Sequence, residues 1–290
     1  MASFLAIARL GSFRSAAREL GISQGAVSQQ LQKLEGLLGV RLIDRDPLGC
    51  RLTVEGREFQ DHARKLQGLV SNALNAFRRR PLAIGASSNI GIYLLHPYLK
   101  AYAAAAEGQE AEVRIDGNTG VVDALACGDI DVAIMEWWDQ RPGYVARIWR
   151  HETLVAIAAP DHPWASLTQV SRAQLLETPL LGGEPGTGTG RLLVDYLGQE
   201  LSALPLGKRL GSTAAVKQWV KAGMGVSLVL TGTVEEEVRA GTLVAIPLEG
   251  KPPCKSLHVA WRDSLADTHP ACRFGSWLSN RLSAERQLVC

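Results

Sequence analysis

The chain has 290 residues, 46% hydrophobic and 21% charged, which predicts two or three globular domains and excludes an intrinsically disordered chain. No apolar run reaches the roughly 18 residues that cross a bilayer, and the first residues lack a secretory signal, so we expect a cytoplasmic protein without membrane contact. Residues 1–80 hold 13 of the 31 basic and 7 of the 29 acidic residues, so their net charge is +6 and the remainder carries −4. This asymmetry indicates a polyanionic partner for the N-terminal region, although a solvated basic surface has the same composition.

The N-terminal region begins with a pattern of short helices. We expect these helices over residues 2–10, 13–20 and 24–38. Ser12 and Ser23 are suited to cap the second and third helices. Ala17, Gly21 and Val27 have the spacing of a helix-turn-helix, with a small residue where the helices cross, a glycine in the turn and an apolar residue beneath it, together with Ile22.

The third helix is amphipathic, because Val27, Leu31, Leu34 and Leu38 recur at helical spacing and predict one buried stripe. The opposite face carries amides and hydroxyls, which read base edges when a helix lies in the major groove of DNA. A merely solvated helix face is the alternative. The residues predicted to contact DNA are Ser23, Gln24, Gly25, Ser28, Gln29, Gln32 and Lys33, with Arg45 and Arg51 from the next element.

Two further elements complete the N-terminal region. Turn-forming residues at 46–49 predict a hairpin over 40–53, whose arginines are suited to phosphate contacts that position a protein on DNA. A helix over 54–79 follows. Its apolar residues are spaced alternately four and three positions apart, as in a heptad repeat, and form one stripe: Phe59, Ala63, Leu66, Val70, Ala73 and Phe77. We expect a homodimer through residues 57–79, with packing of this stripe inside one chain as the alternative.

From residue 82 onward, short apolar runs alternate with helical stretches, which predicts an α/β fold with mostly parallel sheets. Strands are expected at 82–86, 111–115, 131–135, 153–159, 180–181, 207–210, 226–230, 242–247 and 256–261. Helices are expected near 91–104, 119–127, 171–176, 188–201, 213–222 and 267–282.

Several of these predicted helices begin with hydroxyl or amide side chains. Unpaired N–H groups at helix starts bind anions, and open α/β sheets bind ligands beyond the carboxyl ends of their strands. The predicted ligand-binding residues are Ser87, Ser88, Asn118, Thr119, Trp137, Thr187, Thr189, Arg191, Ser212 and Thr213. They indicate a cleft for a small organic anion, in which Glu136 would oppose the ligand unless it points away. Ordinary helix capping and a flexible glycine-rich loop at 184–191 are the alternatives.

The first 56 residues carry motifs that identify a family. The matching segments are 4–8, 11–17, 20–28, 34–35, 38–42, Arg45 and 52–56, which include Gly11-Ser12-Phe13 and Leu20-Gly21-Ile22-Ser23. They resemble the winged helix-turn-helix of LysR-type transcriptional regulators. Two departures are a start only three residues before Phe4 and Gly25, where the family usually has proline or a small polar residue.

Residues 82–290 resemble the effector-binding half of the same family, which is similar to periplasmic solute-binding proteins. The matching segments are 82–85, Leu125, 128–134, 159–163, Val220 and 222–226. The resemblance implies two Rossmann-like lobes, lobe I at about 82–153 and 258–290 and lobe II at about 154–257, with crossovers near 150–155 and 255–260. It also implies cleft residues Ser87, Ser88, Thr119, Thr187 and Thr213, and dimers of dimers.

The combined pattern predicts a winged helix-turn-helix domain at 1–56, a linker and dimerisation helix at 57–81 and an effector-binding domain at 82–290. A hydrolase is disfavoured, because Gly21-Ile22-Ser23-Gln24-Gly25 has the letters of a nucleophile elbow but follows a helix instead of a strand. A solute-binding protein explains only the second half. We therefore expect a DNA-binding regulator that responds to a small molecule and has no catalytic residue, cofactor or metal; Cys-x-x-Cys pairs and histidine clusters are absent from the sequence.

Overall fold

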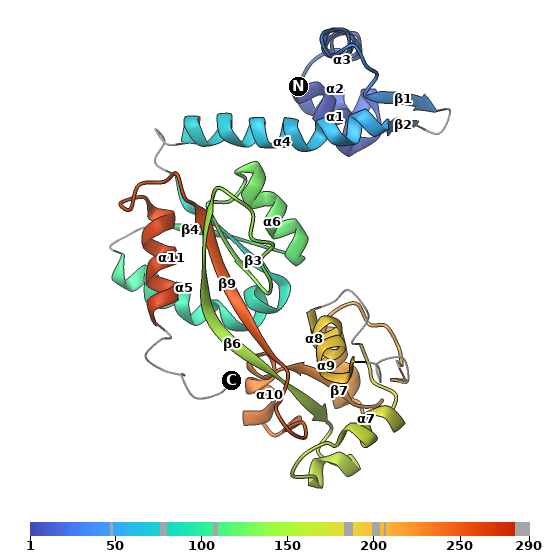
Figure 1. The fold of residues 1–290 in the computed structure, drawn as a ribbon, viewed down its shortest axis with the longest axis vertical. Helices are drawn as coiled ribbons and strands as arrows, with labels where there is room; N and C mark the ends of the chain where they lie inside the picture. The colour runs from blue at the N-terminus through green and yellow to red at the C-terminus, as the bar shows by residue number, and fades with distance from the viewer. Residues whose placement is uncertain are drawn as a thin grey trace. The chain divides into compact units, whose positions relative to one another are not determined.

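The computed structural model describes residues 1–46, 49–75, 80–106, 110–182, 188–198, 204–205 and 207–281. The chain divides into two units, one of Met1–Arg80 with Asp123–Ile130 and one of Pro81–Val122 with Asp131–Cys290. The head is the stretch Met1–Arg80 of the first unit, and the body is the second unit. Figure 1 shows the elements along the chain. Among the described residues, no helix combines the length and apolar character that crossing a bilayer requires.

The head contains α1 (Ala2–Leu10), α2 (Phe13–Leu20), α3 (Gln24–Leu38), β1 (Ile43–Asp46), β2 (Gly49–Leu52) and α4 (Val54–Asn75). Serine side chains cap two of these helices: Ser12 Oγ accepts a hydrogen bond from the backbone N–H of Ser15, and Ser23 Oγ from that of Ala26. Gly21 ends α2 with a φ of +65°, a left-handed conformation that glycine adopts without steric cost. The predicted helix-turn-helix is confirmed.

The core of the head lies between α1, α2 and α3 and the start of α4. Its buried members are Phe4, Ala6, Ile7, Phe13, Ala16, Ala17, Val27, Leu31, Leu42, Ile43 and Ala63. Leu34 packs at the edge of this core, whereas Leu38 is 42% exposed, so its predicted burial is wrong. The described core ends at Leu34, and the last turn of α3 extends beyond it. Ile22 is also exposed, which leaves Val27 alone beneath the turn.

The β1–β2 hairpin, or wing, is held from both sides. Its strands pair antiparallel, from Ile43 with Leu52 to Asp46 with Gly49. Glu35 Oε1 on α3 accepts hydrogen bonds from the backbone N–H groups of Leu42, at 2.8 Å, and Ile43, at 3.2 Å. On the other side, a Cβ at Gly56 of α4 would lie 2.0 Å from the Leu42 carbonyl oxygen, so only glycine fits there.

Helix α4 is described as far as Asn75, so the predicted residues 76–79, Phe77 among them, lie outside the described residues. The start of its apolar stripe belongs to the head: Phe59 packs edge-on against Phe4 with ring centroids 5.3 Å apart, and Ala63 is fully buried. Farther along, Leu66 is 49% and Val70 58% exposed. The head therefore covers the first part of the stripe but not these two side chains.

The body contains the strands β3 (Leu82–Ser87), β4 (Ala111–Asp116), β5 (Val132–Met135), β6 (Tyr144–Ala158), β7 (Ser227–Leu230), β8 (Val244–Ile246) and β9 (Cys254–Arg262). The strand order is β4-β3-β5-β9-β6-β7, with β8 also on β6. Among the named strands of the described residues, β3 pairs in parallel with β4 and β5, while the pairs β5–β9, β6–β9, β6–β7 and β6–β8 are antiparallel. The expectation of mostly parallel sheets is wrong, because two long strands, β6 and β9, pair antiparallel with each other and with their neighbours.

Three predicted strands are also wrong in detail. Residues 180–181 and 207–210 form no strand, because Leu180 makes only an isolated bridge with Val226 among the described residues. The two segments share a few backbone hydrogen bonds, from Gly207 to Leu180 and from Gly182 to Lys208, that do not amount to a ladder. Strand β6 begins at Tyr144 instead of 153. The charged residues in its first half interrupt the apolar pattern by which the sequence reveals a strand.

The helices of the body connect these strands. They are η1 (Ile90–Leu94), α5 (His96–Ala105), η2 (Pro163–Ser166), α7 (Arg172–Glu177), α8 (Gly188–Leu197), α9 (Thr213–Lys221), η4 (Thr231–Thr233), α10 (Glu235–Arg239) and α11 (Pro270–Arg281). Helix α6 (Asn118–Cys127) begins in the body. η1 with α5, α6, α7, α8, α9 and α11 each overlap a predicted helix, with bounds that differ by at most four residues, whereas the short η2, η4 and α10 lie outside the predicted helices.

The body has two lobes with separate cores. Lobe I packs α5, α11 and η1 on β3, β5 and β9 around residues such as Trp149, Phe274 and Leu278. Lobe II packs α7 and α8 on β7 and β8 around residues such as Leu193 and Leu228. Strand β6 belongs to both, because its residues 144–153 pair with β9 and its residues 154–158 with β7 and β8. Figure 1 shows β6 and β9 side by side along the body.

Candidate functional site

The exposed face of α3 is held in place from behind by the core of the head. Val27 and Leu31 are buried, whereas Gln29, which lies between them on the helix, is exposed. Of the predicted DNA contacts, those that are exposed are Ser23, Gln24, Gly25, Gln29, Gln32 and Lys33. Ser28 is half-buried, and the Ser23 hydroxyl is occupied by helix capping. The face presents three amide side chains, each of which both donates and accepts hydrogen bonds, as base edges require.

The wing carries the two predicted phosphate contacts. Arg51 is exposed on β2, opposite Asp44 in the ladder. Arg45 lies on β1, opposite Cys50, and its side chain lies outside what the structure describes. The structure therefore brings α3 and an arginine-bearing hairpin into one unit, joined through Glu35.

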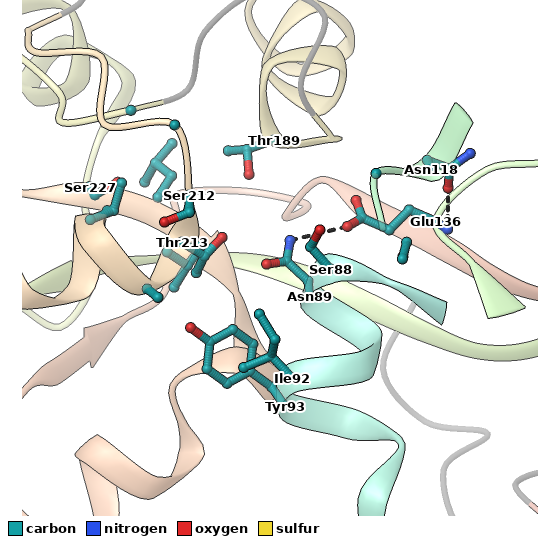
Figure 2. A pocket seen from close by; sticks show the side chains of 18 of the residues that line it. Ser88, Asn89, Ile92, Tyr93, Asn118, Glu136, Thr189, Ser212, Thr213 and Ser227 are labelled. Atoms are coloured by element: carbon teal, nitrogen blue, oxygen red, sulfur yellow. Dashed lines mark hydrogen bonds between the residues drawn. The ribbon is translucent and has the colours of Figure 1, made fainter. Parts of the chain in front are cut away.

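A cavity of about 270 Å³ lies between the two lobes of the body (Figure 2). Lobe I contributes Ser87, Ser88, Asn89, Ile92, Tyr93, Gly117, Asn118, Glu136 and Trp137. Lobe II contributes Gly182, Thr189, Gly211, Ser212, Thr213, Ala214, Val216, Ser227, Leu228 and Val229. The cavity opens beyond the carboxyl ends of β3 and β5, which is where open α/β folds place ligands.

Most of the predicted ligand-binding residues line this cavity. Those that do are Ser87, Ser88, Asn118, Trp137, Thr189, Ser212 and Thr213. Thr119 is exposed and is not part of the lining. Arg191 is exposed and also outside the lining, but its guanidinium stacks on the ring of Trp137 at 4.3 Å from the ring centroid. Thr187 lies outside the described residues.

Hydrogen-bond donors line the cavity from both lobes. Helix α9 starts there: Ser212 Oγ accepts a hydrogen bond from the backbone N–H of Ala215, and Thr213 is the first helical residue. Ser87, at the end of β3, is only 1% exposed, and its hydroxyl has no hydrogen-bond partner within the part of the chain that the structure describes. A buried polar atom without a partner is uncommon, and a bound ligand would satisfy it.

Asn118 fixes the segment that follows β5. Its Oδ1 accepts hydrogen bonds from the backbone N–H groups of Glu136, at 2.8 Å, and Trp137, at 3.3 Å, and its Nδ2 donates to the Trp137 carbonyl at 3.2 Å. Asn118 is buried. Its role is therefore to position two other lining residues, and the dashed line to Glu136 in Figure 2 marks one of these bonds.

Among the described residues, Glu136 is the one carboxylate in the lining of the cavity. No lysine, arginine or histidine of the described residues lines it. Glu136 is 7% exposed. Its Oε1 accepts a hydrogen bond from Asn89 Nδ2 at 3.1 Å, and its Oε2 accepts one from Lys255 Nζ at 2.6 Å. Lys255, on β9, is itself buried, so the two charges compensate each other.

The sequence reasoning missed three polar lining residues, Asn89, Tyr93 and Ser227. Asn89 follows Ser87 and Ser88, and Ser227 is a polar residue inside the apolar run 226–230, so both carried a signal. The Ser227 hydroxyl donates to the Leu181 carbonyl. Tyr93 lies in an apolar helical stretch, where nothing in the sequence separates a lining residue from a core residue.

Residues 75–283 match the family model of the LysR substrate binding domain, and residues 1–57 match that of the bacterial regulatory helix-turn-helix proteins of the lysR family. The chain belongs to the LysR family of transcriptional regulators. Among its relatives, the HTH-type transcriptional regulator PtxE of Stutzerimonas stutzeri is 46% identical over 188 residues, which cover 64% of this chain and 96% of PtxE.

Solved LysR-family structures share the fold. A full-length OxyR variant from Pseudomonas aeruginosa aligns with a TM-score of 0.67 at 23% identity, over 96% of this chain and 91% of OxyR. Full-length CbnR in complex with its target DNA aligns with a TM-score of 0.58 at 20% identity, over 97% of each chain. At these identities the likeness concerns the fold, a helix-turn-helix followed by an α/β body of two lobes.

Proposed function

We propose that this LysR-family protein is a sequence-specific regulator of transcription whose α3 lies in the major groove of promoter DNA. The observation that carries the proposal is the row of exposed amides, Gln24, Gln29 and Gln32, on a helix that a buried core holds from behind. The net charge of +6 on residues 1–80 favours a polyanion at the head. Its structural neighbour CbnR has been solved in complex with its target DNA, which supports DNA binding by this chain. Action on genomic DNA implies a cytoplasmic location.

A pair of variants tests this proposal. Gln29→Ala should reduce the preference for one base pair of the operator by about 1–3 kcal/mol, because a base contact carries sequence information. Arg51→Ala should weaken binding to all sequences about equally and lower the salt slope by about one, as loss of a phosphate contact does. Operator and scrambled duplexes titrated at several salt concentrations measure both quantities. An unchanged base preference in Gln29→Ala would remove α3 from the groove.

The cavity, in the same proposal, binds a small organic anion that controls DNA binding. Its support is the partnerless Ser87 hydroxyl together with the start of α9 at Thr213, since helix N-termini and hydroxyls stabilise anions. A thermal-shift screen of small carboxylates and phosphorylated metabolites identifies the ligand class, because a ligand that binds only the native state raises the Tm.

One matched pair of variants tests the cavity. Thr213→Val keeps the side-chain shape but removes the hydroxyl, and it should abolish the ligand response without changing DNA affinity. Thr119→Val is the control, because Thr119 is exposed outside the lining. Equal ligand responses of the two variants would exclude Thr213 from the site.

We also propose that the protein forms a homodimer through residues 57–79 and, as the family resemblance implies, a homotetramer. The exposed Leu66 and Val70 on α4 support an apolar contact with a second chain. The chain then consists of a DNA-binding domain at 1–56, a linker at 57–81 that forms the dimer contact and an effector-binding domain at 82–290. Val70→Asp should dissociate the dimer in sedimentation experiments, whereas Gln67→Asp, also exposed on α4, should not. A dimeric Val70→Asp protein would contradict the assignment.

A further inference from the structure

We propose that the ligand of the cavity is a small anion that carries its own hydrogen-bond donor, and that Glu136 recognises this donor. The inference rests on the ligand site proposed above and names the chemical class of its occupant. Hydrogenphosphate-type oxyanions, hydroxy acids and amino acids share this chemistry, because each combines anionic oxygens with an O–H or N–H group.

The cavity has two chemically different ends. In Figure 2, Ser212 and Thr213 lie on one side, and Asn89 and Glu136 lie on the other. The first side offers the start of α9 to an anionic group. The second side offers a carboxylate, which accepts hydrogen bonds but repels another anion at close range.

Glu136 retains capacity for a ligand. Each of its oxygens accepts one protein hydrogen bond that the structure describes, from Asn89 and from Lys255. A carboxylate has about four lone-pair sites, so further acceptor positions stay open on a side chain that lines the cavity. A donor on the ligand is the partner that these positions lack.

Lys255 allows a charged Glu136 to be buried at the cavity wall, and it does so without itself facing the ligand. It balances the charge of Glu136 at 2.6 Å, and it does not belong to the lining. The buried carboxylate is therefore compensated from β9, while the surface presented to the cavity at this end is an acceptor. An oxyanion without an O–H or N–H group, such as sulfate or acetate, would set its lone pairs against that acceptor.

Sites built to hydrogen-bond a donor discriminate strongly against analogues that lack it, because the buried polar group then stays unpaired. Three matched pairs of probes test this for the full-length protein by calorimetry near neutral pH: inorganic phosphate with sulfate, glycolate with acetate, and alanine with propionate. In at least one pair, the donor-bearing probe should bind about tenfold or more tightly than its partner.

The decisive variant removes the carboxylate without leaving an unpaired charge. Glu136→Gln alone strands the buried ammonium of Lys255 and is prone to misfold, so Glu136→Gln combined with Lys255→Met is the main variant. In this double variant, the ratio of the two Kd values within the discriminating pair should fall to about threefold or less, chiefly because the donor-free probe binds more tightly. Thermal unfolding of the variant shows that it is folded.

The outcomes separate this inference from the cavity assignment. If the probes bind, Thr213→Val weakens both members of a pair, and the double variant keeps their ratio, then the cavity binds anions but Glu136 does not select them. A wild-type ratio near one in every pair overturns the inference as well. Absence of binding by all six probes overturns both it and the proposed anion site.

Discussion

The exposed face of α3 and the cavity of the body are built in opposite ways. All side chains of the α3 face come from one helix of 15 residues, whose periodicity alone places them together. The lining of the cavity comes from the ends of strands and the starts of helices that lie up to about half the chain apart, such as Ser87 and Ser227. The first site is a property of local structure, whereas the second depends on side chains that fix one segment against another.

Both regions nevertheless use the same kind of fixing contact. Glu35 accepts hydrogen bonds from the consecutive backbone N–H groups of Leu42 and Ile43, and Asn118 accepts them from those of Glu136 and Trp137. If the contrast between the two regions is correct, removal of the contact should disturb the cavity more than the α3 face.

The largest effect is expected for Asn118→Ala. The substitution leaves two backbone N–H groups and one carbonyl without their partner in a buried place, which should lower the free energy of unfolding of the body by about 3 kcal/mol. Because Glu136 and Trp137 lose their anchor, ligand binding should be lost too. Urea denaturation and calorimetry measure the two effects, with Thr119→Ala as control. A loss below about 1 kcal/mol would mean that Asn118 does not hold this wall of the cavity together.

Glu35→Ala should have the next largest effect. Two N–H groups lose their acceptor, but Glu35 is half-buried and water can replace part of the interaction, so about 2 kcal/mol is expected. Since the wing loosens while α3 keeps its own face, DNA affinity should fall for all sequences and base preference should remain. Glu35→Gln retains an acceptor oxygen and should recover most of the stability. A changed base preference in Glu35→Ala would show that the α3 face also depends on this contact.

The smallest effects are expected from one equal change in each region. Ser23→Ala and Ser212→Ala each remove a capping hydrogen bond, worth about 1 kcal/mol of stability. Ser23→Ala should weaken DNA binding and leave ligand binding unchanged, and Ser212→Ala should do the reverse. Titrations of both variants with DNA and with a ligand from the thermal-shift screen measure this. A crossed effect would mean that the local stability of one region depends on the cap of the other.

The same contrast explains what the sequence could predict. The helix-turn-helix followed from Ser12, Gly21 and Ser23, because caps and turns are encoded by neighbouring residues. Leu38 was misplaced, because periodicity shows which residues share a face but not where the core beneath that face ends. Most helices of the body were predicted, since each is again a local pattern.

The cavity was predictable only in part. The pattern of residues at helix starts indicates Ser212 and Thr213. The pairing of β6 with β9, however, decides which helix starts lie close together in the fold, and the alternation of apolar residues does not reveal the direction of a strand. Glu136 was recognised as an obstacle to an anion, yet its partner Lys255 is 119 residues away along the chain. No local pattern could reveal that this charge is compensated.

Strands β6 and β9 pair from Tyr144 with Arg262 to Thr153 with Cys254, with one irregularity between Ile148 and Arg150. Within the described residues, the stretch of β6 at 150–153 and that of β9 at 254–257 pair only with each other, and a two-stranded ribbon twists more than a wider sheet. The lobes are thus joined by this short ribbon, because both strand crossings pass through it. If a ligand contacts both walls of the cavity, it would fix the twist of the ribbon and with it the angle between the two lobes.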